Sequence, residues 1–186
     1  MTIDDLITAL DKAADQTLPA AAVRLFGPSR VPPPSPAEVE AFEAEIGTTL
    51  PDDYRQFLLR SNGGRLDWYR FDGPTTDGKT CPVVLSDVGG LREESDLSLR
   101  AARRCYQGSP LQIPRPLLWI MGDPGGNGIC LGLSGRYRGR VYFWIHDEQP
   151  APEEWDGEVE TAGNVVLLAD SFTDFVAGIG PKDSGE

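Results

Sequence analysis

The sequence is poor in the residues that build metal centres and disulfide frameworks. It contains three cysteines and a single histidine in 186 residues, and no two cysteines are spaced as a CxxC pair. An odd number of widely spaced cysteines argues against a disulfide scaffold, and the lack of a Cys/His cluster argues against zinc. We therefore expect no metal or other cofactor, and a reducing compartment.

Long hydrophobic runs are also missing. No stretch reaches the roughly 18 apolar residues from which a membrane helix is recognised. The opening residues, MTIDDLITALDKAADQ, contain early acids and lack the apolar region of a signal peptide. These features predict a cytoplasmic protein that does not enter a membrane.

Positive charge is scarce as well. Lys and Arg together number 17 against 29 Asp and Glu, which gives a formal net charge of −12. Such a surface repels nucleic acid and anionic lipid and favours a basic protein partner. The alternative is that the acidity serves solubility alone. Most of the basic residues are arginine, and we derive no mechanism from that bias.

Helical signals dominate the first third of the chain. Apolar residues at helical spacing predict a helix over residues 3–14, and a proline-rich stretch at 28–36 is typical of an extended linker. Ser35 and Glu38 form a capping box around Pro36, so a second helix begins there and ends near Gly47. A third helix begins at Pro51 and ends at the Asn-Gly-Gly of residues 62–64.

Strand patterns dominate the remainder. Strands are expected over 66–71, 117–120, 129–133, 141–145 and 164–169, whereas 81–88 suits either a strand or a helix. Helices are expected over 91–106 and from Ser171 to Ile179. The later strands are joined by connections too short for parallel crossovers. The fold class is therefore α+β, with a mainly antiparallel sheet packed with helices.

Three separated blocks resemble the SUKH superfamily, which includes SMI/KNR-type cell-wall regulators of yeast and many bacterial immunity proteins. The first block runs from Glu38 to Gly64 and contains LPDDYRQFL and NGG, and the second is the apolar strand and glycine-rich loop of 119–128. The third comprises the aromatic strand 141–145 and the closing ADSFTDF of 169–175. The likeness covers about residues 34–178. Gly132 departs from it, because relatives often carry an acid at that strand position.

The resemblance implies one SUKH-like domain over residues 34–180, preceded by an N-terminal helix and linker (1–33) and followed by a tail (181–186). It implies binding to a cognate protein toxin, of nuclease or deaminase type, and no catalysis. It transfers no functional residue, because toxin-binding surfaces differ between relatives. The extra N-terminal helix packs on the domain or contacts a partner. A regulatory scaffold of the cell-wall-regulator type is the alternative function.

The residues that could belong to catalytic motifs form only incomplete ones. His146 beside Asp147 could form an acid–base pair, although a surface histidine at a strand end is the simpler interpretation. Ser134 misses the GxSxG pattern by one residue. The glycine-rich loop 122–128 lacks the Lys-Ser/Thr of a phosphate-binding loop and joins two strands, which favours a tight turn. We therefore predict a protein that is not an enzyme.

Residues 147–160, DEQPAPEEWDGEVE, carry seven acids, no base and one tryptophan. The plain interpretation is a solvated loop. The functional one is an acidic surface with an aromatic anchor, since tryptophan is enriched at binding hot spots and carboxylates speed encounter with a basic partner. The predicted partner-binding residues are Asp147, Glu148, Glu153, Glu154, Trp155, Asp156, Glu158, Asp72, Asp77, Glu93 and Glu94.

Overall fold

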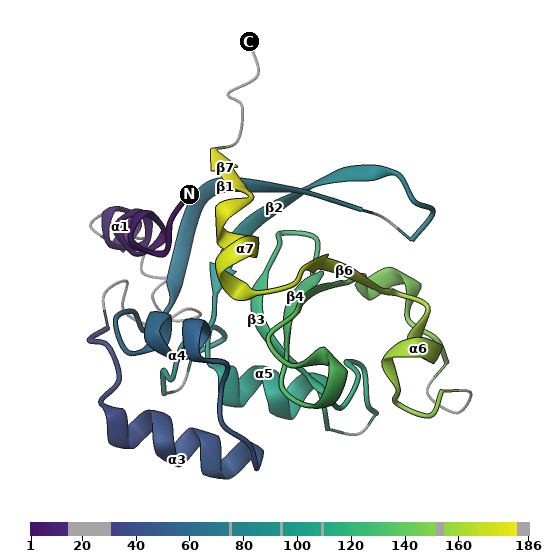
Figure 1. Ribbon diagram of the computed structural model, residues 1–186, viewed down its shortest axis with the longest axis horizontal. Coiled ribbons are helices and arrows are strands. Elements are labelled where there is room, and N and C mark those ends of the chain that lie inside the picture. Colours follow the sequence, from purple (N-terminus) through teal and green to yellow (C-terminus); the bar gives the residue numbers. More distant parts are fainter. Residues whose placement is uncertain (15–30, 75, 94, 109, 152–154, 182–186) are drawn as a thin grey trace.

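A seven-stranded antiparallel sheet forms the centre of the computed structural model, which describes residues 1–14, 31–74, 76–93, 95–108, 110–151 and 155–181 (Figure 1). Consecutive strands pair from β1 to β6, and β7 adds to the free side of β1. The predicted α+β class with an antiparallel sheet is confirmed. The strands are β1 (Gly64–Pro74), β2 (Thr80–Val88), β3 (Leu117–Gly122), β4 (Gly128–Gly132), β5 (Val141–Trp144), β6 (Val165–Ala169) and β7 (Ile179–Pro181).

The sheet is curled, and α7 (Phe172–Ala177) connects its two edge strands, β6 and β7 (Figure 1). The curl brings β6 close to β1, since a Cβ added to Gly73 would lie 2.8 Å from the Leu168 side chain. Phe172 packs edge-on against Tyr54, with ring centroids 5.0 Å apart. Phe175 contacts Phe71 of β1 at 4.9 Å. The aromatic face of α7 therefore fills the inside of the curled sheet.

The helix that follows Ser35 begins and ends where its capping residues predict. In α3 (Pro36–Ile46), the Glu38 carboxylate accepts a hydrogen bond from the Ser35 backbone N–H at 2.7 Å, and the Ser35 hydroxyl accepts one from the Glu38 N–H. Gly47 ends the helix in the left-handed conformation, with φ 75°. The capping box and the glycine C-cap are both confirmed. Helix α4 (Asp52–Leu58) follows after a short connection and ends before the Asn-Gly-Gly of residues 62–64, so it is shorter than predicted.

Helix α1 (Ile3–Ala14) packs against β1 and α7. Its apolar stripe, Leu6, Ala9 and Leu10, is buried in the same core as the sheet. An ion pair between Asp4 and Arg60 adds a surface contact to the segment after α4. This helix therefore belongs to the core of the molecule, and the division of the chain near residue 33 remains a prediction.

Two later helices are also shorter than predicted. Helix α5 spans only Leu99–Tyr106, because Ser98 supplies its N-cap and Gly90 is hydrogen-bonded to both Leu97 and Leu99. Those bonds hold the described residues before the helix in a loop, in which Leu91, Arg92 and Leu97 are buried. Ile179 lies in β7 opposite Phe71 and not in the last helix. The ambiguous stretch around residues 81–88 is a strand.

The turn between β4 and β5 explains the glycine at position 132. A Cβ at Gly132 would lie 1.8 Å from the Tyr137 carbonyl oxygen, so no larger side chain fits without moving backbone. The turn contains the short helix η1 (Gly135–Tyr137) and folds back onto β4 through the Gly139 N–H, which donates to the Gly132 carbonyl. Two further short elements, η2 (His146–Glu148) and α6 (Val159–Ala162), follow β5.

Candidate protein-binding surfaces

The predicted acidic residues fall into separate groups in the structure. The first group lies at the β1–β2 hairpin and at η2, which are joined by a hydrogen bond from the Thr76 hydroxyl to the Glu148 carboxylate at 3.0 Å. Asp77 lies in the hairpin turn, and Asp147 extends from η2 with 89% of its side chain exposed. The fold therefore brings together acids that are some seventy residues apart in the sequence.

The charges on the hairpin itself are largely balanced. Asp72 receives two hydrogen bonds from Arg70, at 2.7 and 2.9 Å, which hold the pKa of this carboxyl below its usual range. Asp77 is paired with Lys79. Free negative charge therefore concentrates on η2, where Glu148 is bonded to a neutral hydroxyl.

The second group surrounds α6, on the same side of the molecule as the far end of the hairpin (Figure 1). Trp155 is half-buried, and its indole N–H donates to the Glu158 carbonyl at 2.9 Å. The Asp156 carboxylate accepts from the Thr161 hydroxyl and from the Glu158 N–H, and these bonds lower its pKa. Trp155 and Asp156 thus organise this loop, and their role as a partner contact stays a prediction.

Of the remaining predicted residues, only Glu93 is described, and it does not join these two groups. Glu93 is exposed in the segment before α5, where it lines a groove together with Arg92 and Arg100. Glu94, Glu153 and Glu154 lie outside the described residues. We define the acidic side as the residues that the fold does gather near the hairpin, η2 and α6: Asp72, Asp77, Asp147, Glu148, Asp156 and Glu158.

His146 and the glycine-rich loop 122–128, which the sequence offered as candidates for catalysis or phosphate binding, have simple structural roles. His146 is half-exposed, its ring nitrogen Nδ1 lies 3.1 Å from the Asp147 carboxylate, and its ring packs edge-on against Trp144. In the glycine-rich loop, the Asp123 carboxylate accepts hydrogen bonds from the N–H groups of Gly125 and Asn127 at 2.9 and 2.8 Å. The loop is therefore a self-bonded turn between β3 and β4, as expected.

Two kinds of feature are absent from the described part of the chain. No three His, Cys, Asp or Glu side chains are grouped as a metal site would require. None of its helices has the length and apolar character to cross a membrane.

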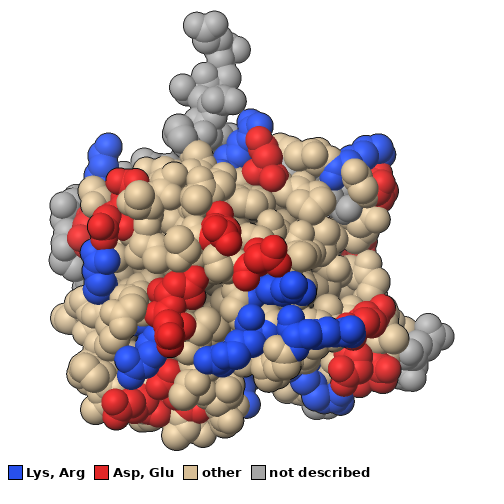
Figure 2. All heavy atoms as spheres, viewed as in Figure 1, with Lys and Arg blue, Asp and Glu red and all other residues tan. Residues whose placement is uncertain are grey.

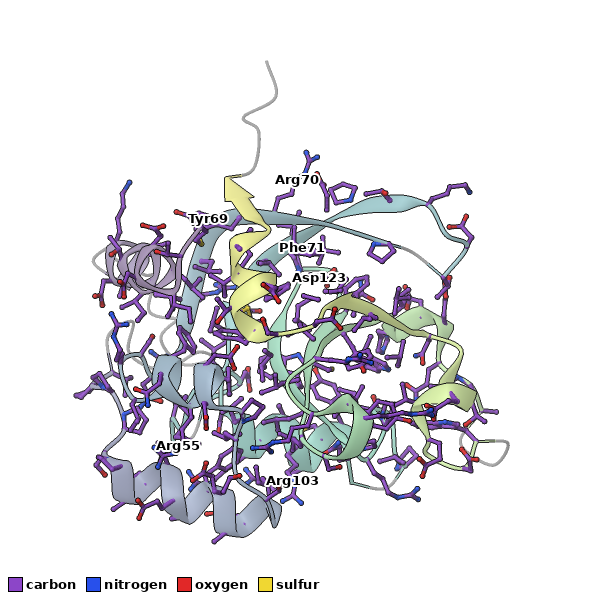
Figure 3. The ribbon with its side chains drawn as sticks, viewed as in Figure 1. Arg55, Tyr69, Arg70, Phe71, Arg103 and Asp123 are labelled. Carbon is purple, nitrogen blue, oxygen red and sulfur yellow. The ribbon has the colours of Figure 1, made fainter. Side chains whose placement is uncertain are left out.

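An arginine-lined groove between α3 and α5 was missed in the sequence. Arg100, Arg103 and Arg104 lie along one side of α5, and Figure 3 shows Arg103 on the same side of the molecule as α3. Basic side chains also form a band across the face in Figure 2, so the surface is not uniformly acidic. The signal was present as three arginines spaced i, i+3 and i+4 on a predicted helix. A net charge of −12 does not reveal such a local group of bases.

Comparison with known proteins agrees with this fold. A family model described as SMI1 / KNR4 family (SUKH-1) matches residues 33–178. The SPbeta prophage-derived uncharacterized protein YokK of Bacillus subtilis (strain 168) is 26% identical over 157 residues, covering 75% of this chain and 71% of that protein. The resemblance seen in the three sequence blocks is confirmed, and the chain belongs to the SMI1/KNR4 family (SUKH-1).

Proposed function

We propose that this protein is a cytoplasmic, non-catalytic immunity protein that neutralises a basic cognate toxin, of nuclease or deaminase type, by direct binding through its acidic side. Family membership supports a protein-binding role. The observation that carries the choice of surface is the pair Asp147 and Glu148, which presents negative charge beside the hairpin without a lysine or arginine partner in the contacts found for either carboxylate.

Inhibition by occlusion follows from the chemistry of such toxins. A nuclease holds phosphates in a cationic groove, and a carboxylate-bearing surface can occupy that groove in place of the substrate. Opposite charges also accelerate the encounter between toxin and inhibitor, and salt weakens this acceleration. Inhibition then needs only a stable complex, and no covalent bond is made or broken in either protein.

The test is co-expression with the toxin encoded by the neighbouring reading frame. We expect the wild-type chain to restore growth and to bind the purified toxin. The double variant Asp147→Asn/Glu148→Gln should lower the association rate about tenfold at low salt. The matched control is Glu40→Gln/Asp52→Asn, which removes two exposed charges from α3 and α4 and should bind within about twofold of wild type.

The outcomes separate this role from a regulatory one. If the neighbouring frame encodes no toxin and the chain rescues no toxicity, the immunity function is wrong. If binding is retained but both double variants behave alike, the immunity function stands and the acidic side is the wrong surface.

A further inference from the structure

The groove between α3 and α5 differs from the acidic side in both charge and construction. It has a volume of about 370 Å³ and is lined by Phe42 and Glu45 of α3 and by Arg100, Arg103, Arg104 and Gln107 of the α5 segment. Three arginines therefore face one carboxylate. This excess of positive charge is local to one helix of a chain whose net charge is −12.

Arg100 is the fixed member of the three. It makes two parallel hydrogen bonds to the Glu45 carboxylate, at 2.8 and 2.9 Å, and its guanidinium lies 5.5 Å from the centre of the Phe42 ring. This pairing lowers the pKa of Glu45 and raises that of Arg100. One positive charge is thus balanced, and the planar guanidinium forms a rigid part of the groove wall.

Arg103 and Arg104 carry the uncompensated charge. Arg103 is exposed and donates to the Glu45 backbone carbonyl at 3.2 Å, which places its guanidinium across from α3 without neutralising it. Arg104 is also exposed and acts electrostatically on the Glu45 carboxylate, and no hydrogen bond or ion pair is found for it among the described residues. A larger groove of about 830 Å³ shares Arg100 and Arg104 and extends the surface towards Pro32 and Asn62.

We propose that this arginine groove binds an extended acidic segment of a partner protein, with Arg103 and Arg104 holding its carboxylates. Charge complementarity decides the occupant, because two unpaired guanidiniums can each bind a carboxylate through parallel hydrogen bonds. The two grooves share Arg100 and Arg104 and together reach from Gln107 to Pro32, which gives room for an extended chain. Because it lies apart from the hairpin and η2, this proposal does not depend on the acidic side or on the identity of any toxin.

A peptide fits better than a nucleic acid. Nucleic-acid binding draws its affinity from many phosphate contacts distributed along the polyanion. Here the unpaired positive charge is confined to two adjacent residues, and Glu38, Glu45 and Glu93 act electrostatically on the neighbouring Arg100. The overall charge of −12 further repels a long polyanion. A few carboxylates on a short segment can be accommodated without that repulsion.

The experiment uses a fluorescein-labelled peptide, Gly-Glu-Leu-Glu-Glu-Leu-Glu-Gly, and follows its fluorescence anisotropy during titration with the whole protein. We expect saturable binding that weakens as salt is raised, and no binding of the same peptide with glutamine in place of glutamate. Arg103→Gln/Arg104→Gln should weaken binding about tenfold or more. Arg104→Gln alone should give an intermediate loss.

The matched control is Lys12→Gln/Lys79→Gln, which removes the same charge from α1 and the hairpin and should change the affinity less than about twofold. Asp147→Asn/Glu148→Gln should leave peptide binding intact, so failure here and failure of the acidic side are distinguishable. The proposal is overturned if wild type does not bind the glutamate peptide, if both charge-matched variants weaken binding equally, or if a single-stranded oligonucleotide of about ten nucleotides displaces the peptide at lower concentration than unlabelled peptide does.

Discussion

The acidic side and the arginine groove are opposite in charge and are built in different ways. The groove lies on two helices, and Phe42 beneath Arg100 is 1% exposed and forms part of the core. The acidic side lies on a hairpin end and short 3₁₀ and helical turns, and the hydrogen bond from Thr76 to Glu148 joins two of its parts. One surface is therefore supported by buried packing and the other by exposed polar contacts.

This difference shows that the net charge of a chain and the location of its binding surfaces are separate properties. Net charge reports which polyions the whole chain attracts or repels. It does not say where a binding surface lies, because acids such as Asp72 and Asp77 are paired within the hairpin while two arginines of α5 are not paired with acids. A rigid support also lowers the ordering cost of binding, which favours the groove, whereas exposed carboxylates on the acidic side favour rapid encounter.

The largest effect is expected from Phe42→Ala, which removes the buried support of the groove. The free energy of unfolding should fall by about 3–5 kcal/mol, because a cavity replaces a ring in the core. Urea denaturation measures this loss. Leu167→Ala is the control on the exposed face of β6, where 42% of the side chain is already in solvent, and it should cost less than about 1 kcal/mol. Equal losses would mean that the groove is not supported by the core as described.

Ser35→Ala changes the same helix, α3, and should lower the free energy of unfolding by less than Phe42→Ala does. The hydroxyl caps α3, and its loss should lower the free energy of unfolding by about 1 kcal/mol. Thermal and urea unfolding should agree on this value. Thr2→Ala, which removes the hydroxyl that accepts from the Asp5 N–H at the start of α1, is the matched control for a cap away from the groove. Peptide binding should weaken only in the Ser35 variant.

Local signals predicted most of the elements, because their causes lie within a few residues. The capping box of Ser35 and Glu38, the glycine after α3 and the aromatic strand β5 each depend on neighbours in sequence. The start of α5 was predicted too early because its boundary depends on contacts of Gly90 with Leu97 and Leu99. Strand β7 was missed, since a three-residue strand is defined by its partner β1 and not by its own pattern.

The candidate site was less predictable from sequence, because it depends on which charges meet. The sequence grouped Glu93 with the acids of 147–160, but Glu93 lies beside the arginines before and within α5. It also predicted Trp155 as an aromatic anchor for a partner, and this stays a prediction; in the structure its indole N–H is bonded inside its own loop. The pairing of Thr76 with Glu148 spans 72 positions and leaves no trace in local sequence.

The ion pair between Arg100 and Glu45, which shapes the groove, should make the free energy of unfolding depend on pH. Arg100 lowers the pKa of Glu45 below its ordinary value of 4.5, so the pair stabilises the fold above that value and its contribution is lost as pH falls through the lower, folded pKa. Glu45→Gln should therefore be less stable than wild type at pH 7, by roughly 0.3–1 kcal/mol for a half-exposed pair. In acid, the free energies of unfolding of wild type and of Glu45→Gln should become equal. Urea midpoints at several pH values measure the difference, and a constant gap would contradict the pairing.

The smallest change in stability is expected from Thr76→Ala on the acidic side. The hydroxyl bonds an exposed carboxylate, so its removal should change the free energy of unfolding by no more than about 0.5 kcal/mol. The local effect should be larger, because η2 and the hairpin end then lose the bond between their side chains, and hydrogen exchange in residues 76–80 should become faster. Thr8→Ala in α1, which loses a hydroxyl bond to the Asp4 carbonyl, is the control and should leave hairpin exchange unchanged. A global loss as large as that of Ser35→Ala would show that the acidic side is as firmly supported as the groove, and the contrast between the two surfaces would then rest on charge alone.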